Sequence, residues 1–550
     1  MDNNRLAELL FPNIDKTTED YEKIYPKRNL QEGAKVTRLG PSPTGFIHLG
    51  NLYGAFVDER LAHQSGGVFY LRIEDTDDKR FVEGAVKIII DSLRFFGIDF
   101  DEGAGLDGDV GEYGDYTQSR RGEIYACFAK KLVREGKAYP CFLTESEIGE
   151  IRKKQEESKQ NPGIYGEFAV HRELTIDEIE AKIKAGIPYV LRLKSDGNPD
   201  SEKAGRIKVE DAIRGVLEMP ENFQDIVILK TTGIPTYHFA HVVDDYLMRT
   251  THVVRGAEWL PSLPIHIELF EKLGLEPPVY CHTAQLMKLD ENGNKRKLSK
   301  REDPELSLDY YRNMGYHPAA VREYLLTILN SNFEEWRDEN PDADIDAFEF
   351  TTDKMSNSGA LFDLNKLNDI SKDVLLRIPA KSIIEFLRKW AEEFKPEIMY
   401  IFGDENYLEK IIDLGRNDKK PRKDLIYAQQ IIEFISYFYD EMFVREDEIP
   451  QEVSKDDAAV ILKKYLASYN HGDDQSQWFD KIREIGVGLG YAAKPKDFKK
   501  NPQDFKGHVD HVSTVIRIAL MGRAQSPDVW SIQQIMGEDM TRRRLESFDL

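Results

Sequence analysis

The sequence has few cysteines and no long apolar segment. Its 550 residues include three cysteines, Cys127, Cys141 and Cys281, which lie far apart and form no Cys-x-x-Cys pair. They can supply neither a disulfide framework nor the four ligands of a cysteine-only zinc site, which fits a reducing compartment. No run approaches the roughly 18 consecutive apolar residues of a membrane-spanning helix, and residues 1–16 lack the apolar core of a secretory signal. We therefore expect a cytoplasmic protein that does not enter a membrane.

Positive charge is also scarce. The chain has 98 acidic and 75 basic residues, which gives a formal net charge of −23. This excess argues against nucleic acid wrapping the whole surface, although it leaves room for a local basic face. Basic residues do gather at 295–301, 416–423, 494–500 and 542–544. Because most charge clusters are only solvated surface, each of these needs a second indication before it counts as a binding site.

The chain is too long for a single hydrophobic core. A length of 550 residues predicts roughly three or four domains. Apolar residues make up 41% of the sequence, which is enough to fill that many cores. Residues 1–33 precede the first strand-like run, and we assign them no chemistry.

The strongest local signal is GPSPTGFIHLGN, residues 40–51. It follows a short apolar run and precedes a segment whose apolar residues recur at helical spacing, so it predicts a strand, a loop and a helix. Gly45 and Gly50 would let a phosphate or a flat base approach the backbone, and a helix N-terminus offers free N–H groups to an anion. A simple Pro/Gly turn that exposes His48 is the more common explanation of so short a string, so further support is needed.

A second predicted strand, residues 68–73, ends at Glu74. In a parallel sheet, ligands bind beyond the carboxyl ends of the strands. We therefore expect Arg38, His48 and Glu74 to meet in one crevice, although carboxylates at a strand end more often form a turn or a cap.

The middle of the chain looks like an insertion into this fold. A helix predicted at 120–135 is followed by charged and mixed segments up to residue 230. The sheet is then expected to resume with strands at 225–230, 235–241 and 251–256.

Two features follow the predicted sheet. The segment 285–301 ends in KRKLSKR, whose mobile ammonium groups could close over a triphosphate. From residue 303 helices are expected, including one with a capping box of Ser382 and Glu385 and with an apolar stripe formed by Ile383, Leu387, Trp390 and Phe394.

PSPTGFIHLG and, about 250 residues later, KLSKR resemble the two signature motifs of class I aminoacyl-tRNA synthetases. The longer strings TRLGPSPTG, YLRIEDTD, GEYGDYTQSR, GIPTYHFAHVVDDYLMRTTHVVRGAEWL and KLSKRED are similar to bacterial-type glutamyl-tRNA synthetases, from about residue 35 to the C-terminus. The related glutaminyl enzymes typically carry an EPNG-type first motif and β-barrel anticodon domains. Here the first motif is PSPTG and the C-terminal part of the chain is predicted to be helical, so the resemblance favours the glutamyl enzymes.

The resemblance implies a multidomain fold, α/β followed by all-α. A Rossmann-type nucleotide-binding catalytic domain would be split by an insertion and followed by a helical stem-contact domain and helical C-terminal anticodon-binding domains. The expected parts are an N-terminal extension at 1–33, the catalytic domain at 34–115 and 232–295, an inserted acceptor-end-binding domain at 116–231, a stem-contact domain with the KLSKR loop at 296–375, and an anticodon-binding region at 376–550.

The implied activity is that of a glutamate-tRNA ligase. Such an enzyme uses ATP to convert L-glutamate to glutamyl adenylate and transfers the acyl group to the 3′ end of tRNA(Glu). No protein nucleophile is needed, because transfer at phosphorus is catalysed by positioning and charge neutralisation. The expected partners are tRNA(Glu), L-glutamate and ATP with Mg²⁺, and we expect a monomer. Two alternatives stay open: a non-discriminating enzyme that also charges tRNA(Gln) with glutamate, and a catalytically silent tRNA-binding paralogue.

The resemblance also assigns residues to ATP. His48 and Lys300 would be the catalytic residues, with His48 facing the nucleotide and Lys300 holding the phosphates as pyrophosphate leaves. Mg²⁺ would bridge phosphate oxygens rather than occupy an all-protein site. The full set of residues implied for ATP is Thr44, Gly45, His48, Gly50, Glu258, Trp259, Lys297 and Lys300.

Glutamate needs a cation for its side-chain carboxylate and an anion for its amino group. Planar guanidinium groups bind carboxylates in a bidentate manner, and a site built for a carboxylate can reject glutamine by a factor of about 10⁴. Without the resemblance, Arg255 could equally form a salt bridge at a strand end. The residues implied for glutamate are Arg38, Ser42, Glu74, Tyr237 and Arg255.

Three further expectations concern other positions. Arg416 and Arg422 are candidates to read the anticodon, because unstacked bases are commonly hydrogen-bonded by arginine. His241 stands where relatives often carry a different residue near the glutamate, so no role is assigned to it. Some relatives bind zinc in the insertion through a Cys-x-Cys pair, whereas this chain reads Cys141-Phe-Leu there, so we expect no zinc.

Overall fold

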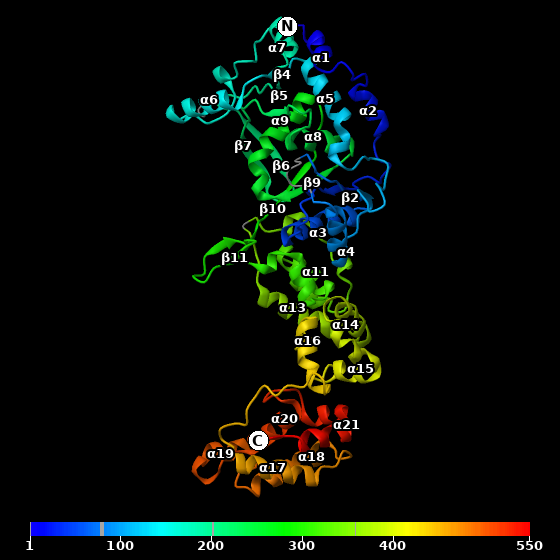
Figure 1. Ribbon diagram of the computed structural model, residues 1–550, viewed down its shortest axis with the longest axis vertical. Coiled ribbons are helices and arrows are strands. Elements are labelled where there is room, and N and C mark those ends of the chain that lie inside the picture. Colours follow the sequence, from blue (N-terminus) through cyan, green and yellow to red (C-terminus); the bar gives the residue numbers. More distant parts are fainter. Residues whose placement is uncertain (1, 77–81, 201–202, 358, 550) are drawn as a thin grey trace. The chain divides into compact units, whose positions relative to one another are not determined.

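The structure is a computed structural model that describes residues 2–76, 82–200, 203–357 and 359–549 (Figure 1). The chain forms two compact units. The first comprises the residues up to Tyr310 together with Arg322–Asp363, and the second comprises Tyr311–Val321 and the chain from Leu364 on. The first unit contains all the described strands and the second is helical, so the predicted combination of an α/β part with an all-α part is confirmed.

A parallel sheet forms the centre of the first unit. On one side β1 (Val36–Leu39), β2 (Val68–Leu71) and β3 (Glu102–Gly103) lie in that order, and on the other β9 (His252–Gly256) pairs with β10 (Val279–Thr283). The two sides meet where Thr251 N donates to Val36 O over 2.9 Å. The chain thus leaves β1 to one side and returns through β9 on the other, which makes this point the topological switch of a Rossmann-type sheet.

Helices pack on this sheet and connect its strands. The helix α3 (Leu49–Gln64) lies against β1, β2 and β9, as the strand-loop-helix signal predicts. The other helices of this part are α4 (Ala85–Phe95), α8 (Tyr237–Leu247) and α9 (Leu263–Leu273).

The expectation of strands at 225–230 and 235–241 in this sheet is wrong. The first segment contains β8 (Val227–Leu229), which pairs with β5 (Val190–Leu193) in a separate sheet that also includes β4 (Ala138–Cys141). The second segment begins the helix α8, in which Phe239, Val242, Val243 and Leu247 are buried at helical spacing.

The inserted segment is joined closely to the central sheet. Its hairpin, β6 (Arg206–Asp211) and β7 (Gly215–Pro220), extends the sheet because β6 runs parallel to β10. The helix α5 (Gly122–Arg134) confirms the helix predicted at 120–135 and packs against α8 and α9. The domain boundaries at 116 and 231 stay a prediction. The remaining inserted helices are α6 (Glu145–Glu157) and α7 (Ile176–Lys184).

Residues 2–33 are part of the first unit and pack within it through α1 (Asn3–Leu10) and α2 (Thr18–Ile24), which contact α5. Beyond these helices Arg28 is almost fully buried. Its guanidinium donates to both carboxylate oxygens of Glu102, over 2.8 and 3.0 Å, and to Met248 O over 3.1 Å. Arg28 therefore links the C-terminal end of the N-terminal extension to the sheet, in addition to the contacts of α1 and α2 with α5.

Replacing Arg28 by alanine is expected to loosen residues 1–33. Glu102 would keep the Tyr116 hydroxyl as a partner but lose its cation, at a cost of about 3 kcal/mol. This corresponds to an increase of about a hundredfold in the rate of limited proteolysis within residues 1–33. Lys23→Ala is the matched control, because Lys23 is exposed and pairs with Asp20 on its own helix. Equal cleavage rates in the two variants would contradict this role of Arg28.

The segment after β10 forms a small sheet and a group of helices. The hairpin of β11 (Leu286–Leu289) and β12 (Lys295–Lys297) pairs with β13 (Ala360–Leu361). The helices that follow the hairpin are α10 (Leu308–Met314), α11 (Pro318–Leu329) and α12 (Phe333–Glu339).

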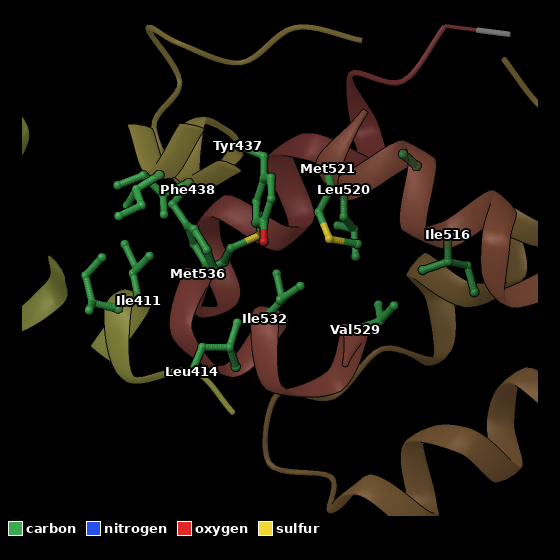
Figure 2. Packing of buried hydrophobic residues seen from close by; sticks show 14 of the residues in the cluster. Ile411, Leu414, Tyr437, Phe438, Ile516, Leu520, Met521, Val529, Ile532 and Met536 are labelled. Atoms are coloured by element: carbon green, nitrogen blue, oxygen red, sulfur yellow. The ribbon is translucent and has the colours of Figure 1, made fainter. Parts of the chain in front are cut away.

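The second unit contains helices and loops but no strand among its described residues. A continuous apolar core joins its early and late helices, and Figure 2 shows Ile411 and Leu414 together with Tyr437, Ile532 and Met536 in that core. None of the described helices in the protein has the length and apolar character needed to cross a membrane. The α-helices of the second unit from residue 364 on are α13 (Leu364–Arg377), α14 (Ala380–Phe394), α15 (Glu405–Asp413), α16 (Ala428–Ile435), α17 (Lys455–Ser468), α18 (Gln475–Val487), α19 (Pro495–Lys500), α20 (Val509–Met521) and α21 (Val529–Glu546).

The capping box expected at Ser382 is wrong. The helix α14 begins at Ala380, so Ser382 already lies inside it, and Glu385 pairs with Lys389 one turn later. The predicted apolar stripe is present: Ile383, Leu387 and Trp390 are buried in the core, with Phe394 partly buried beside them.

Candidate active site

The loop after β1 leads into α3 at His48. The His48 Nδ1 accepts a hydrogen bond from Asn51 N over 3.2 Å, and the Asn51 side chain accepts from His48 N over 3.1 Å. This reciprocal cap uses Nδ1 as an acceptor, so the ring proton is on Nε2, the other ring nitrogen. Burial lowers the pKa of His48, with Glu258 and Lys297 acting on it in opposite directions. His48 is therefore a neutral hydrogen-bond donor at the N-terminus of a helix.

Two glycines of this loop are required by close packing. A Cβ atom on Gly50 would lie 2.9 Å from His48 Nδ1, and one on Gly40 would lie 2.4 Å from Glu74 Oε1. Gly45 has a φ of +71°, which favours glycine. The loop is thus shaped around His48 on one side and around Glu74 on the other, while the side chain of Ser42 is exposed.

The structure brings Arg38 and Glu74 together through two residues that the sequence did not single out. Asp245 on α8 accepts from Arg38 Nε over 3.2 Å and from Arg72 Nη1 over 2.7 Å. Arg72 Nη2 also donates to Glu74 over 2.9 Å. Burial opposes the ionisation of Asp245, but Arg38 and Arg72 outweigh it and hold its pKa below the usual value. Burial raises the pKa of Glu74, although Arg72 and Arg38 act to lower it.

Arg255 lies at the end of β9 in different surroundings. Its Nε donates to His282 Nε2 over 2.9 Å, and its Nη1 lies 3.0 Å from His266 Nδ1. Its Nη2 is buried and makes no hydrogen bond to any residue that the structure describes.

The side chain of Tyr237 is affected by both Glu74 and Arg255: burial and Glu74 raise its pKa, while Arg255 lowers it. Tyr237 therefore lies within electrostatic reach of both Glu74 and Arg255.

His241 lies between the two arginines predicted to bind glutamate. Its Nδ1 is 3.4 Å from Arg38 Nη2, and its ring stacks on His266 with a centroid separation of 4.4 Å. Burial, reinforced by Arg38 and Arg255, holds its pKa well below the usual value. His241 is thus a neutral, fully buried spacer.

The KLSKR loop has a fixed base and a free tip. At the base, Asp303 accepts two hydrogen bonds from Arg296, over 2.6 and 2.7 Å, and another from Ser299 N over 2.8 Å. At the tip, Lys300 Nζ lies 3.8 Å from the centroid of the Phe46 ring in the first signature loop. Lys300 makes no ion pair with any described residue. The structure therefore brings the two signature motifs into contact.

The other residues predicted for ATP lie near this contact. Glu258 follows β9 and accepts from Gln285 over 3.2 Å. The exposed ring of Trp259 lies 4.8 Å from that of Tyr237. Thr44 N donates to Ser42 O over 2.8 Å within the loop. Together with His48, these residues follow the carboxyl ends of β1 and β9, the two strands that meet at the switch point of the sheet.

The two anticodon candidates lie in the second unit and differ in their surroundings. The Nη2 of Arg416 donates to the carbonyl oxygens of Leu375 and Ile378, over 2.6 Å each, and its Nη1 pairs with Asp413. Both terminal nitrogens of Arg416 are therefore engaged, Nη2 at the end of α13 and Nη1 at the end of α15. Arg422 donates from Nε to Asp424 over 2.6 Å, and its Nη1 and Nη2 have no hydrogen-bond partner among the described residues. Arg422 thus has two terminal nitrogens without a hydrogen-bond partner in the described part of the chain, although both of them are buried.

A cavity of about 600 Å³ opens among α18, α20 and α21. The Nε of Arg517 is buried there without a hydrogen-bond partner in the described part of the chain. No local motif in the sequence marks this cavity, because its lining comes from three separate helices. The lining combines aromatic and polar side chains, among them Trp478, Phe479, Asp510, Ser513, Arg517 and Asp528.

Within the described residues, no group of three or more histidine, cysteine or acidic side chains is arranged to hold a metal ion. The three cysteines are buried and unpaired, with Cys141 on β4. The absence of zinc stays a prediction that metal analysis of the purified protein can test.

Comparisons with known proteins agree with the sequence motifs. The family model described as "tRNA synthetases class I (E and Q), catalytic domain" matches residues 35–369, and one described as "Anticodon binding domain" matches residues 499–548. A glutamate–tRNA ligase of Acetivibrio thermocellus is 62% identical over 548 residues, covering 99% of this chain and 100% of the relative. One of Clostridium perfringens is 49% identical over 555 residues, with 100% of both chains covered.

A crystal structure of a glutamate tRNA ligase from Elizabethkingia meningosepticum, solved in complex with its amino acid, is also similar. It has a TM-score of 0.72 and 25% sequence identity, and the match covers 93% of this chain and 98% of that chain. The similarity thus extends over both units, and the cavity that contains Arg517 lies partly within the residues matched by the anticodon-binding model.

Proposed function

Because this chain belongs to the class I tRNA synthetase family of glutamate and glutamine enzymes, we propose that it is a glutamate-tRNA ligase. It activates L-glutamate with ATP and transfers the glutamyl group to the 3′ end of tRNA(Glu). The observation that carries this proposal is the charge pattern of the crevice. Two buried arginines, Arg38 and Arg255, and the carboxylate of Glu74 all act electrostatically on the side chain of Tyr237, and L-glutamate carries two carboxylates and one ammonium group.

Glutamate is bound by charge complementarity. Arg255 receives the side-chain carboxylate, because its Nη2 is buried and lacks a hydrogen-bond partner among the described residues, and Arg38 adds positive charge nearby. Glu74 receives the ammonium group, and Ser42 and Tyr237 complete the polar lining. Glutamine would place N–H donors against the donors of Arg255, which disfavours it strongly.

ATP lies along the first signature loop. His48 donates from Nε2, and Gly45 and Gly50 let the nucleotide approach the backbone at Thr44. Glu258 and Trp259 lie beside the adenosine. Lys297 and Lys300 hold the phosphates, with Mg²⁺ neutralising phosphate oxygens.

The reaction has two steps. An oxygen of the glutamate α-carboxylate attacks the α-phosphorus of ATP, and pyrophosphate leaves with the electrons of the broken P–O bond. A ribose hydroxyl of the terminal adenosine of tRNA then attacks the carbonyl carbon of glutamyl adenylate, and AMP leaves. The chain's contribution is to orient the reactants and to stabilise negative charge on the phosphates.

The tRNA is held by the remaining parts of the chain. The segment 116–231 binds the acceptor end, residues 296–375 contact the stem, and the helices from 376 on bind the anticodon loop. A nucleobase fits the cavity among α18, α20 and α21, because Trp478 and Phe479 offer apolar ring surface and Arg517 offers hydrogen bonds. We expect the enzyme to act as a cytoplasmic monomer.

Replacing Arg517 by alanine is expected to raise KM for tRNA about tenfold, since one hydrogen-bonding contact to a base is lost. KM for ATP and for glutamate should stay within twofold. Arg445→Ala is a suitable control, because Arg445 lies in the same unit, pairs with Glu448 and does not line the cavity. The nucleobase assignment would be refuted if Arg517→Ala charged tRNA as efficiently as Arg445→Ala.

The test of the function is aminoacylation with purified protein, ATP, Mg²⁺, labelled glutamate and tRNA. Formation of glutamyl-tRNA supports the proposal. Protein that binds tRNA without charging it would instead be the silent paralogue. Parallel assays with tRNA(Glu) and tRNA(Gln) separate a discriminating enzyme, which charges only the first, from a non-discriminating one.

A further inference from the structure

Arg255 is held by imidazoles rather than by a carboxylate. Arg38 donates to the carboxylate of Asp245, which it shares with Arg72, so part of its charge is compensated within the protein. Arg255, by contrast, is hydrogen-bonded to the ring nitrogens of His282 and His266, and its guanidinium also lies 4.7 Å from the centroid of the Tyr280 ring. A neutral acceptor fixes the direction of a guanidinium without cancelling its charge.

The tautomer of His282 is fixed by Asp211 at the end of β6. The His282 Nδ1 lies 2.6 Å from Asp211 Oδ2, and His282 N donates to the same oxygen over 3.1 Å. The other oxygen, Asp211 Oδ1, accepts from the backbone N–H groups of Ile213 and Arg214, over 3.0 and 2.9 Å. Both carboxylate oxygens are therefore acceptors, so the ring proton of His282 is on Nδ1 and the lone pair on Nε2 faces Arg255.

The tautomer of His266, the second contact of Arg255, is fixed by its hydrogen bonds in the same way. Arg255 Nη1 donates to His266 Nδ1, so the ring proton of His266 is on Nε2. This Nε2 lies 2.9 Å from His238 Nδ1. Burial lowers the pKa of His282, of His266 and of His238. All three rings are thus neutral near pH 7 and none repels Arg255.

We propose that Asp211 and His282 are positioning residues for amino-acid selection, which hold Arg255 by a neutral acceptor so that its Nη2 and its charge stay available to the side-chain carboxylate of the substrate. Since β6 belongs to the inserted segment, that segment takes part in choosing the amino acid as well as in binding tRNA. This proposal rests on the proposed function, because it assumes that Arg255 binds glutamate.

Asp211→Asn tests the proposal with little change in volume. An asparagine has only one acceptor oxygen, so its amide nitrogen must face either the backbone donors of residues 213 and 214 or the Nδ1–H of His282. In the second arrangement His282 takes the opposite tautomer and turns an N–H toward Arg255 Nε, as occurs when the aspartate of a catalytic triad is replaced by asparagine. We expect KM for glutamate to rise about 10- to 100-fold, because a misplaced binding group loses up to that factor. KM for ATP should stay within twofold, and the preference for glutamate over glutamine should fall.

Two variants of His282 sharpen the test. A glutamine amide can reach the position of Nε2 and still accept from Arg255, whereas an asparagine amide reaches the position of Nδ1 and contacts Asp211 alone. We therefore expect His282→Gln to keep at least ten times more of the glutamate-specific kcat/KM than His282→Asn. If both variants lose activity equally, or if ATP and glutamate are affected alike, His282 has only a structural role and the proposal fails.

Failure of the proposal is distinguishable from failure of the function. Wild-type protein is measured in the same aminoacylation assay, and if it forms no glutamyl-tRNA the proposed function itself is wrong. If the wild type is active and Asp211→Asn matches it in KM for glutamate and in discrimination against glutamine, the positioning role is refuted. Thermal unfolding of each variant identifies one that does not fold, and the pair of His282 variants then decides.

Discussion

Arg255→Met is expected to lower kcat/KM for glutamate about a thousandfold. The substitution removes a buried guanidinium whose Nη2 has no hydrogen-bond partner among the described residues and whose nearest contacts are neutral rings. Charge-assisted hydrogen bonds contribute about 1.5–3 kcal/mol each, so the loss of two to a substrate carboxylate amounts to about 4 kcal/mol, or a factor of about 10³. The measurement is steady-state aminoacylation at varied glutamate, with ATP and tRNA saturating.

Arg255→Lys is the matched control for charge. Lysine keeps the positive charge but lacks the planar fork that binds a carboxylate in a bidentate manner. We expect it to recover about tenfold of the lost kcat/KM and to leave KM for ATP unchanged. Full recovery would show that charge alone is needed at this position, and an effect of Arg255→Met on ATP as large as that on glutamate would remove Arg255 from the glutamate site.

The parts of the fold that depend on local signals could be predicted from the sequence. The apolar run before GPSPTG, the two glycines and the amphipathic segment after His48 predict a strand, a loop and a helix, and the structure has β1 and α3 there. The prediction failed where a short apolar run is compatible with both the periodicity of a strand and that of a helix. The segment 235–241 reads as a strand, but its apolar pattern continues at helical spacing through Leu247 as part of α8.

The surroundings of the site could not be predicted, because they depend on contacts between residues far apart in the chain. Arg72 meets Asp245 across 173 residues, and His282 meets Asp211 across 71. Neither pair belongs to a motif whose spacing would reveal it. The roles of the predicted site residues stay predictions, but the structure does show which of their neighbours neutralise them and which leave them charged.

A basic cluster in the sequence likewise does not reveal how each of its members is used. Arg416 and Arg422 lie in the same cluster, yet the terminal nitrogens of Arg416 are engaged by backbone carbonyl oxygens and Asp413, whereas those of Arg422 have no hydrogen-bond partner among the described residues. The same division occurs in the KLSKR loop. Arg296 is bound to Asp303 at the base of the loop, and Lys300 at its tip forms no ion pair with any described residue.

Lys300→Ala is accordingly expected to slow glutamyl adenylate formation about 10²- to 10³-fold while changing the Kd for tRNA less than twofold. The ammonium group rests on the Phe46 ring beside His48, from where it can follow the phosphates as charge develops on the leaving pyrophosphate. Loss of one group that stabilises such charge costs about 3–4 kcal/mol. The rate is measured by ATP–pyrophosphate exchange in the presence of tRNA, and the affinity is measured by direct titration of tRNA.

Arg301→Ala separates this role from the general charge of the loop. Arg301 is the next residue and equally exposed, so its removal lowers the positive charge of the loop by the same amount. If Lys300 acts on the phosphates, Arg301→Ala should retain at least a third of the exchange rate. Comparable losses in the two variants, or a weakening of tRNA binding by Lys300→Ala that matches the loss in rate, would instead mean that the loop binds tRNA as a basic patch. Because the base of the loop is fixed by Asp303 in either variant, the comparison isolates the chemistry of the tip from the folding of the loop.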